Sequence, residues 1–372
     1  MLIFSIIGTL IGAGFASGQE MYLFFYRFGL NGILGLVLCS MLISIVIYKT
    51  FLIIHTREIY NYEDFLREIF HSEKLSNISN IIVNAFLLIT FYIMISGFGA
   101  YFEQQFEIYA IIGAIILATI SFVVLIKDID GVKRVNSIVV PVLIVVILII
   151  GFLSLKNIYS RSGEIWQVNL EDKFSFDWIL QSIVYCSYNM ILVIPVLVNL
   201  GKYIRKVTSS HVQVALQPHE SKKLNLVAPE KSSDFSYAIK NKKQILVISI
   251  LSGTIVLVLS LSIFLVLASM NVDYLRIQMP AVYAIDNNFP QFSGVYGIVI
   301  LLSIFSTAIS IGISFLKNIT KNKNSYPQFV AIMCISGVLI SNFGFSNLVK
   351  ILFPVFGYLG IVEIIWILKT NE

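Results

Sequence analysis

The chain has 372 residues, of which 57% are hydrophobic and 13% are charged, and its mean hydropathy is +0.86. The 26 Lys and Arg and the 21 Asp and Glu are too few to cover a water-soluble globule of this size. This composition excludes a disordered chain and a soluble enzyme, and it predicts an all-α polytopic membrane protein whose solvent is largely the lipid bilayer.

Ten apolar runs are long enough, at roughly 20 residues each, to cross about 30 Å of hydrocarbon as helices. No small-residue cleavage site follows the first run, so we interpret it as a membrane helix and not as a signal peptide. The predicted membrane helices are 1–28, 31–54, 78–102, 108–127, 136–155, 175–200, 244–269, 293–316, 326–343 and 346–368.

The distribution of Lys and Arg over the connecting loops predicts the orientation of these helices. If the first helix runs outward, the inside loops hold twenty of these residues and the outside loops five. Both termini are therefore expected in the cytoplasm. The net charge of +5 reports this topology and requires no nucleic-acid partner. The frequent Ile, Asn and Lys residues suggest a bacterial chain, and hence the plasma membrane.

Two loops of similar length carry amphipathic, helix-like text, around 62–70 and around 281–285. They fall on opposite sides of the membrane, as expected if two five-helix units, residues 1–155 and 175–368, form an inverted repeat. The segment 201–243 is long, polar and rich in lysine, and it is expected to be a mobile cytoplasmic loop within a single membrane domain.

The first helix contains Gly8, Gly12, Gly14 and Gly18 in a short run. This spacing fits close packing against a neighbouring helix. It also fits a helix that is broken in mid-membrane, because each glycine costs roughly 1 kcal/mol relative to alanine in a helix. A break would free peptide groups to hold a small solute and a cation. The residues of this half of the predicted solute site are Gly12, Ala13, Gly14 and Ser17.

Apart from Asp177 at the very start of the sixth run, two carboxyl groups fall inside predicted membrane helices, and such groups are costly there. Glu20 lies in the outer half of the first helix, where we expect a role in gating or coupling, or alternatively a pair with Arg27. Glu363 lies near the cytoplasmic end of the last helix, where snorkelling or pairing is as plausible as a function.

The sixth helix carries the second polar stretch, followed by Pro195, and we expect a second break there. Tyr92, in the third helix, could close one side of the same pocket. The residues of this half of the predicted solute site are Tyr185, Ser187, Tyr188 and Asn189.

The eighth helix presents hydroxyl groups on shared faces, at Ser303 and Thr307 and at Ser306 and Ser310. With carbonyls freed from the first helix they would form an all-oxygen cage suited to Na⁺. The alternative is that each hydroxyl bonds to a carbonyl of its own helix.

Catalytic and metal-binding patterns of other kinds are absent from the sequence, so an enzyme is not expected. The four histidines lie in polar connections, and the three cysteines, Cys39, Cys186 and Cys334, show no CxxC spacing. No cofactor is predicted apart from Na⁺ as a possible coupling ion.

The text from Gly12 to Glu20, followed by Phe24 and Phe25, resembles the YkvI-like family of bacterial membrane proteins, and 185–189 resembles that family's second polar motif. That family is similar to the amino acid/polyamine/organocation superfamily, whose leucine-transporter fold has five plus five inverted helices with the first helix of each repeat broken. The resemblance implies at most one sodium ion, because Phe15 stands where the leucine transporter of that superfamily has an Asn that binds a second ion. The ion ligands that it implies are the carbonyls of Gly8, Ile11 and Ser303 and the hydroxyls of Ser306 and Thr307.

Two functions remain open from the sequence. The first is a secondary active transporter of a small zwitterionic solute, such as an amino acid, that works by alternating access with Na⁺ or H⁺ coupling. The second is a ligand-sensing membrane subunit with the same fold, like a germinant receptor of spore formers, in which 201–243 would dock a partner.

Overall fold

The computed structural model describes residues 2–127, 130–160, 176–199, 242–270, 272, 274–320 and 325–370, and these ranges are helical without strands. The loop predicted at 201–243 lies almost wholly outside the described residues. The helices in chain order are α1 (Leu2–Leu10), α2 (Ala13–Ala16), α3 (Gln19–Phe24), η1 (Tyr26–Phe28), α4 (Leu30–Arg57), α5 (Tyr62–Phe70), α6 (Glu73–Phe106), α7 (Ala110–Lys127), α8 (Asp130–Ser160), α9 (Asp177–Asn199), α10 (Lys242–Ala268), α11 (Pro280–Asn288), α12 (Pro290–Ile319), α13 (Tyr326–Ile340), η7 (Ser341–Phe343) and α14 (Phe345–Lys369).

Eight helical stretches in the described ranges are long and apolar enough to cross a membrane. They belong to α4, α6, α8, α9, α10, α12, α13 with η7, and α14, while α7 is a shorter apolar helix. The first apolar run is divided into α1, α2 and α3. The all-α membrane architecture is confirmed, whereas the count of ten crossings and the inverted repeat stay predictions.

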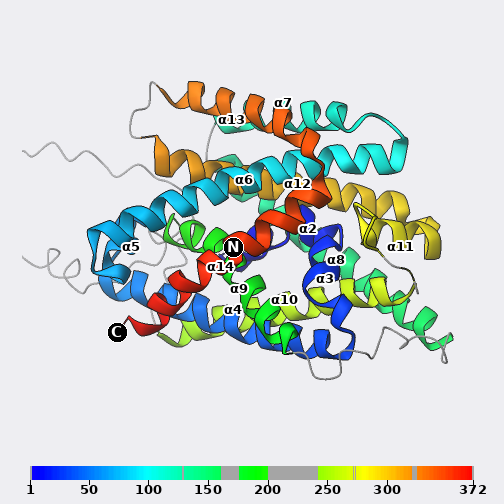
Figure 1. The fold of residues 1–372 in the computed structure, drawn as a ribbon, viewed down its shortest axis with the longest axis horizontal. Coiled ribbons are helices and arrows are strands. Elements are labelled where there is room, and N and C mark those ends of the chain that lie inside the picture. Colours follow the sequence, from blue (N-terminus) through cyan, green and yellow to red (C-terminus); the bar gives the residue numbers. More distant parts are fainter. Residues whose placement is uncertain are drawn as a thin grey trace, which may run out of the picture.

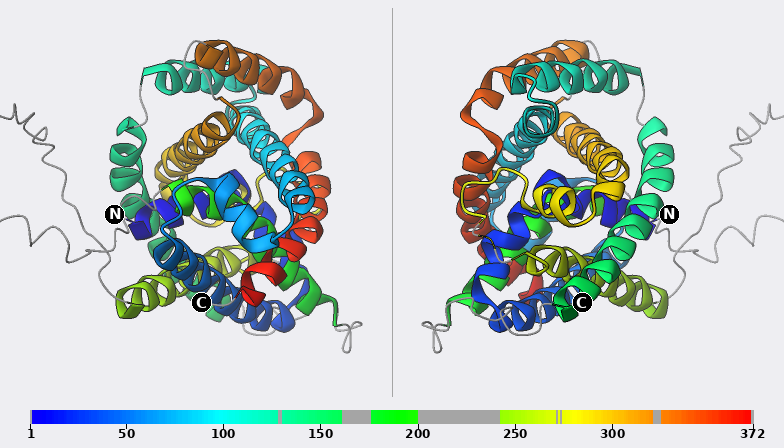
Figure 2. Two further views of the ribbon diagram at one scale, coloured as in Figure 1. Left: turned by 90° about the vertical axis from the view of Figure 1, so that its left-hand side faces the viewer. Right: turned by 90° about the vertical axis from the view of Figure 1, so that its right-hand side faces the viewer.

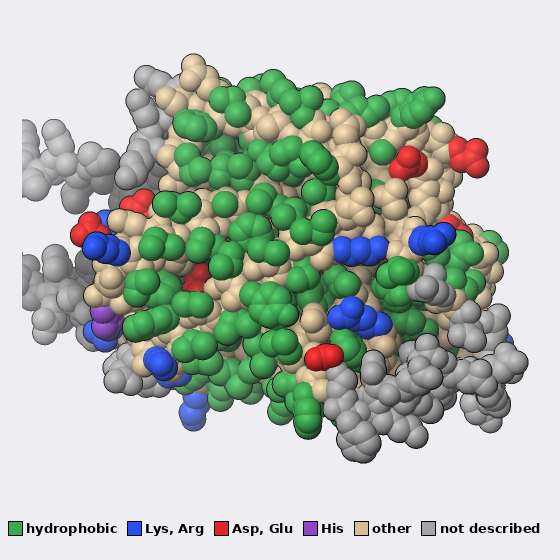
Figure 3. Space-filling view, viewed as in Figure 1, with side chains coloured by type: hydrophobic (Ala, Val, Ile, Leu, Met, Phe, Trp, Pro, Cys, Tyr) green, Lys and Arg blue, Asp and Glu red, His purple; other side chains and the backbone are tan. Residues whose placement is uncertain are grey.

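The outer surface of the bundle is apolar, as a bilayer requires. Large side chains such as Leu34, Met41 and Ile45 of α4 are 56%, 60% and 48% exposed. Figure 3 shows hydrophobic side chains covering the middle of one face, with most of the charged groups toward its two ends. A soluble protein would expose far fewer contiguous apolar groups.

The first segment runs through the middle of the bundle. Figure 1 and Figure 2 show α7 and α13 together on one side and α4 and α10 on the other, with α1–α3 between them. Helices α6, α9 and α12 contact this central segment, and its residues from Ile6 to Met21 are buried. The fold therefore places the predicted break among the three helices that were expected to complete the site.

The two short amphipathic helices lie at opposite ends of the bundle, α5 at one end and α11 at the other (Figure 1). Helix α5 begins with an N-cap, because the Asn61 side chain accepts a hydrogen bond from the Glu63 amide at 3.2 Å. It buries Phe65 and Leu66 against the bundle. The prediction that these two loops contain helices is confirmed, and so is their placement at opposite ends.

Candidate functional site

The first segment is broken where its glycines predict. Helix α1 ends at Leu10, α2 begins at Ala13, and Gly12 between them has extended backbone, with φ −93° and ψ −166°. A second interruption, which the sequence analysis did not predict, lies at Gly18, where φ is +78°. A glycine tolerates this left-handed conformation without the strain that a side chain would add.

Hydroxyl groups of α12 meet the peptide carbonyls that the break frees. Thr307 Oγ1 donates to Gly8 O at 3.0 Å and lies 3.2 Å from Ile11 O, and Ser303 Oγ donates to Ile11 O at 2.5 Å. Both side chains are buried, with exposures of 1% for Thr307 and 0% for Ser303. Four of the five predicted ion-binding residues therefore lie together, although Ser303 contributes its hydroxyl and not its carbonyl.

The chemistry of this oxygen cluster suits a monovalent cation. Its members are two neutral carbonyls and two neutral hydroxyls, which are hard ligands without formal charge. A hydroxyl can rotate its proton away and present a lone pair to an ion. Ser306, the fifth predicted ligand, is also buried on α12, and its carbonyl accepts a hydrogen bond from Ser310.

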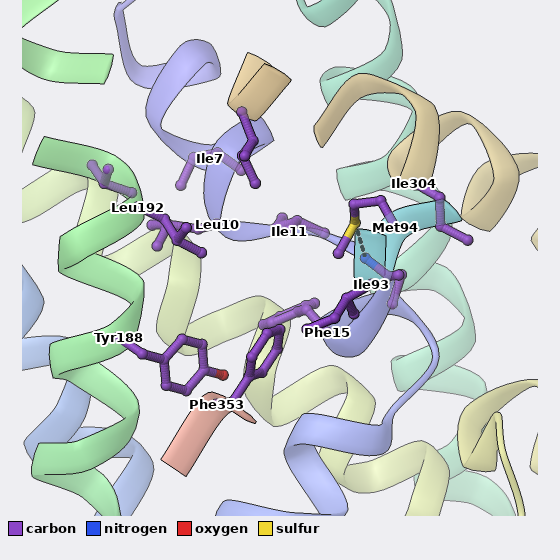
Figure 4. Packing of buried hydrophobic residues seen from close by; sticks show 14 of the residues in the cluster. Ile7, Leu10, Ile11, Phe15, Ile93, Met94, Tyr188, Leu192, Ile304 and Phe353 are labelled. Carbon is purple, nitrogen blue, oxygen red and sulfur yellow. Dashed lines mark hydrogen bonds between the residues drawn. The ribbon is translucent and has the colours of Figure 1, made fainter. Parts of the chain in front are cut away.

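Helix α6 supports the break through a residue that the sequence analysis missed. The amide of Ala13 donates to Met94 Sδ at 3.4 Å, and the same methionine contacts the position that a Cβ on Gly12 would occupy. Figure 4 shows Met94 reaching the turn beside Ile11. Nothing in the text around Met94 distinguishes it from a core methionine, so the sequence offered no signal for this role.

Tyr92 does not face the break, so its assignment to the solute pocket is wrong. Its hydroxyl lies 2.7 Å from Ser336 Oγ of α13, and its ring lies beside Gly337 of the same helix. Tyr92 and Met94 stand two positions apart on α6 and therefore project in different directions.

Glu20 is buried at the centre of the site, with 4% of its surface exposed. Its Oε2 accepts a hydrogen bond of 2.7 Å from the Tyr188 hydroxyl, and its Oε1 occupies the space that a Cβ on Gly14 would need. The alternative pairing with Arg27 is wrong, because that guanidinium is exposed and lies 4.7 Å from the ring centre of Phe28.

Helix α9 is continuous, so the second break predicted for the polar stretch before Pro195 is wrong. The polar side chains here bond to their own helix. Ser187 Oγ donates to Ile183 O at 2.7 Å, and Asn189 Nδ2 donates to Tyr185 O at 2.9 Å. This back-bonding satisfies the side chains without exposing peptide groups. Helix α9 therefore contributes the side chains of Tyr185 and Tyr188 to the site, and not a set of freed carbonyls.

Ser17 has a structural task at the second interruption. Its hydroxyl donates to Gly14 O at 3.1 Å and accepts from the Gln19 amide at 3.3 Å, which joins α2 to α3. The carbonyl of Ser17 accepts a hydrogen bond of 2.7 Å from the amide of Ala281, which connects α11 to the first segment. The Tyr296 hydroxyl of α12 donates to the neighbouring carbonyl of Ala16.

Glu363 lies at the α5 end of the bundle, away from this site. It is 3% exposed and accepts a hydrogen bond of 3.1 Å from Tyr62 of α5. Burial, followed by the neighbouring carboxyl group, raises the pKa of Tyr62 well above its usual value, so this phenol stays a hydrogen-bond donor. Its burial and its hydrogen bond to Tyr62 fit pairing and not snorkelling, and a function of Glu363 stays a hypothesis.

A groove of about 330 Å³ opens between α7 and α13, lined by apolar residues that include Phe122 and Val338. It lies on the outer surface and contains none of the predicted site residues. The side chains of Tyr188, Phe353 and Phe15, by contrast, are buried inside the bundle near the break (Figure 4).

Two curated proteins of Bacillus subtilis (strain 168) are similar to the chain over nearly its whole length. The first is named uncharacterized membrane protein YkvI, is 26% identical, and is matched over 98% of this chain and 93% of its own length. The second, uncharacterized protein YyaD, is 22% identical over 98% of this chain and 94% of its own. No family model matches the chain.

Solved structures share the fold at low sequence identity. Mhp1, a nucleobase-cation-symport-1 family transporter, superposes with a TM-score of 0.60 at 13% identity, over 96% of this chain and 74% of that one. A manganese transporter of Eremococcus coleocola gives 0.60 at 14% identity, over 99% and 78%. The resemblance to YkvI-like membrane proteins is thus confirmed, and the chain shares the fold of these two solved structures.

Proposed function

We propose that this chain is a secondary active transporter of a small zwitterionic solute, an amino acid, that works by alternating access with Na⁺ or H⁺ coupling. The observation that carries the proposal is the break at Gly12, whose freed carbonyls meet hydroxyls of α12. Broken backbone at membrane depth is tolerated where it lines a site inside the protein.

The cluster of Gly8, Ile11, Ser303 and Thr307 supports Na⁺ as the coupling ion. Its oxygens come from two separate helices, so an ion bound there would hold α1 against α12. An ion that binds one conformation better than the other shifts the equilibrium between them. The solute would bind next to this ion, against the peptide groups of Gly12–Gly14, which directly follow Ile11 in the chain.

Flux through purified protein in liposomes tests the transport proposal. We expect uptake or counterflow of at least one amino acid when a Na⁺ or pH gradient is imposed. The absence of both uptake and counterflow for every amino acid would refute the proposal. Saturable binding without flux would favour the sensing subunit instead.

Substitution of the hydroxyls tests the ion. Replacing Ser303 by Ala and Thr307 by Val should abolish the dependence of uptake on Na⁺, because both changes remove oxygen ligands. Ser314→Ala is the matched control, since Ser314 is buried on α12 and donates to Ser310 O of its own helix. A double variant that keeps its Na⁺ dependence would refute this site, whereas wild-type uptake that needs a pH gradient and no Na⁺ would leave H⁺ as the coupling ion.

A further inference from the structure

Glu20 places a carboxyl group inside the bundle, where the first segment meets α9. Its Oε2 accepts from Tyr188, and its Oε1 fills the space beside Gly14. The carboxyl therefore lies directly against the peptide groups that the proposed function assigns to the solute.

Within the described ranges, the groups that act on this carboxyl are neutral. They are the phenol hydroxyls of Tyr188 and Tyr185. The cation nearest in sequence, Arg27, is exposed and stacks on an adjacent ring. The ion pair of Arg57 and Glu68 lies elsewhere, at the junction of α4 and α5. A carboxylate buried without a cation is costly, so a positively charged group of the solute would complete the site.

Aromatic rings surround the same point. Phe24 lies 5.4 Å from Tyr185 and 5.5 Å from Tyr188, measured between ring centres, and Phe353 stacks on Tyr188 at 4.7 Å. All four rings are at most 2% exposed. The faces of aromatic rings attract ammonium groups, and they do so most strongly where water is excluded.

The continuity of α9 removes the other expected partner for a cation. Its peptide carbonyls are engaged in the helix, and the Asn189 amide, which was expected to help hold an ammonium group, donates to Tyr185 O. Among the described residues, Glu20 is the acidic side chain that the structure places beside the break.

We propose that Glu20 binds the protonated amino group of the solute, with the rings of Phe24, Tyr185, Tyr188 and Phe353 around it. The inference rests on the proposed function and specifies it further, because it makes a primary ammonium group the feature that the site recognises. The carboxylate of the solute then contributes less to recognition than its ammonium group, and simple amines are expected to bind as well.

Thermal stabilisation of the purified full-length chain tests this specificity. The probes are alanine, leucine and phenylalanine, their amines (ethylamine, isopentylamine and phenethylamine), and their deaminated acids (propionate, 4-methylpentanoate and 3-phenylpropionate). We expect at least one amino acid and its amine to raise the melting temperature, and the matching acid to have no effect.

The variant Glu20→Gln removes the charge and keeps the shape of the side chain. We expect it to bind the effective amine about thirtyfold or more weakly, the loss typical when one member of a buried charge pair is removed. Glu363→Gln is the matched control, because it makes the same change at the other buried carboxyl and should leave amine affinity unchanged.

A second variant keeps the carboxyl and displaces it. The added Cβ in Gly14→Ala would overlap the present position of Glu20 Oε1, so the side chain must move. We expect a similar loss of amine affinity, and this variant keeps the inference testable if Glu20→Gln fails to fold.

The inference would be overturned by normal amine affinity in Glu20→Gln, by binding of the deaminated acids alone, or by no response of the wild-type chain to any probe. Transport of an acid by wild-type protein would refute this inference and leave the transport function standing. Amine binding that depends on Glu20, without any flux, would support the role of Glu20 and refute the transport function.

Discussion

The first segment and α9 meet in the centre of the bundle, and each carries a stretch of polar sequence inside an apolar run. The first segment is nevertheless interrupted twice, whereas α9 is continuous. The difference lies in where their polarity resides. In the first segment it resides in the peptide groups, which can depart from helical geometry because glycine has a low helix propensity. In α9 it resides in hydroxyl and amide side chains, which bond back to their own helix. Polar composition alone therefore does not predict a broken membrane helix, whereas clustered glycines do.

The largest effect is expected at the second interruption. In Gly18→Ala, a side chain at φ +78° would be strained, and its Cβ would stand 2.8 Å from the Cβ of Ala281. Strain and overlap together should cost about 3 kcal/mol of stability, lowering the melting temperature and loosening α11.

Gly29→Ala is its control, because Gly29 also has positive φ, at +56°, but nothing lies within 4 Å of its added Cβ. This variant should lose about 1–2 kcal/mol from strain alone. Equal melting temperatures for the two variants would contradict the close contact between Gly18 and α11.

A smaller effect is expected where α9 touches the first segment. Tyr188→Phe keeps the ring stacked on Phe353 but removes the donor to the Glu20 carboxyl. Loss of one hydrogen bond to a buried charged group should cost about 2 kcal/mol. Melting temperatures of this variant and of Tyr358→Phe, whose ring is 47% exposed on α14, make the comparison. Equal stability of the two would show that Tyr188 does not hold Glu20 in place.

The smallest effect is expected within α9 itself. Ser187→Ala removes a hydroxyl that bonds only to a carbonyl of its own helix among the interactions described, and that carbonyl keeps its helical partner. Stability should change by less than about 1 kcal/mol. A large loss of stability or of solute affinity would show that α9 uses this hydroxyl at the site, and that the two segments resemble each other more than their backbones indicate.

Much of the site follows from local sequence. The glycines predict the break, and the spacing of Gly8 and Ile11 against Ser303 and Thr307, carried over by family resemblance, predicts which oxygens meet across α1 and α12. The amphipathic text at 62–70 matches α5 residue for residue. The break and α5 depend on backbone preference and helical periodicity, which act over a few neighbouring residues, whereas the meeting of α1 with α12 was implied by the resemblance.

Other parts of the site depend on partners far apart in the chain. Tyr92 was expected at the pocket and instead meets Ser336 of α13, because the packed bundle decides which neighbour each face of α6 meets. Met94, two residues on, takes the place beside the break. A sequence pattern gives the face of a helix, but not which neighbour that face will meet.

By itself, the sequence determined that the chain lies in a membrane, and it named the glycines around Gly12 and the hydroxyls of α12 as candidates for a break and for its oxygen ligands. Only the tertiary structure decided that α9 stays whole and that Glu20 turns toward Tyr188, 168 positions away, and not toward Arg27. The physical reason is that a glycine weakens a helix wherever it occurs, whereas a buried carboxyl takes whichever donors the packed bundle brings within reach.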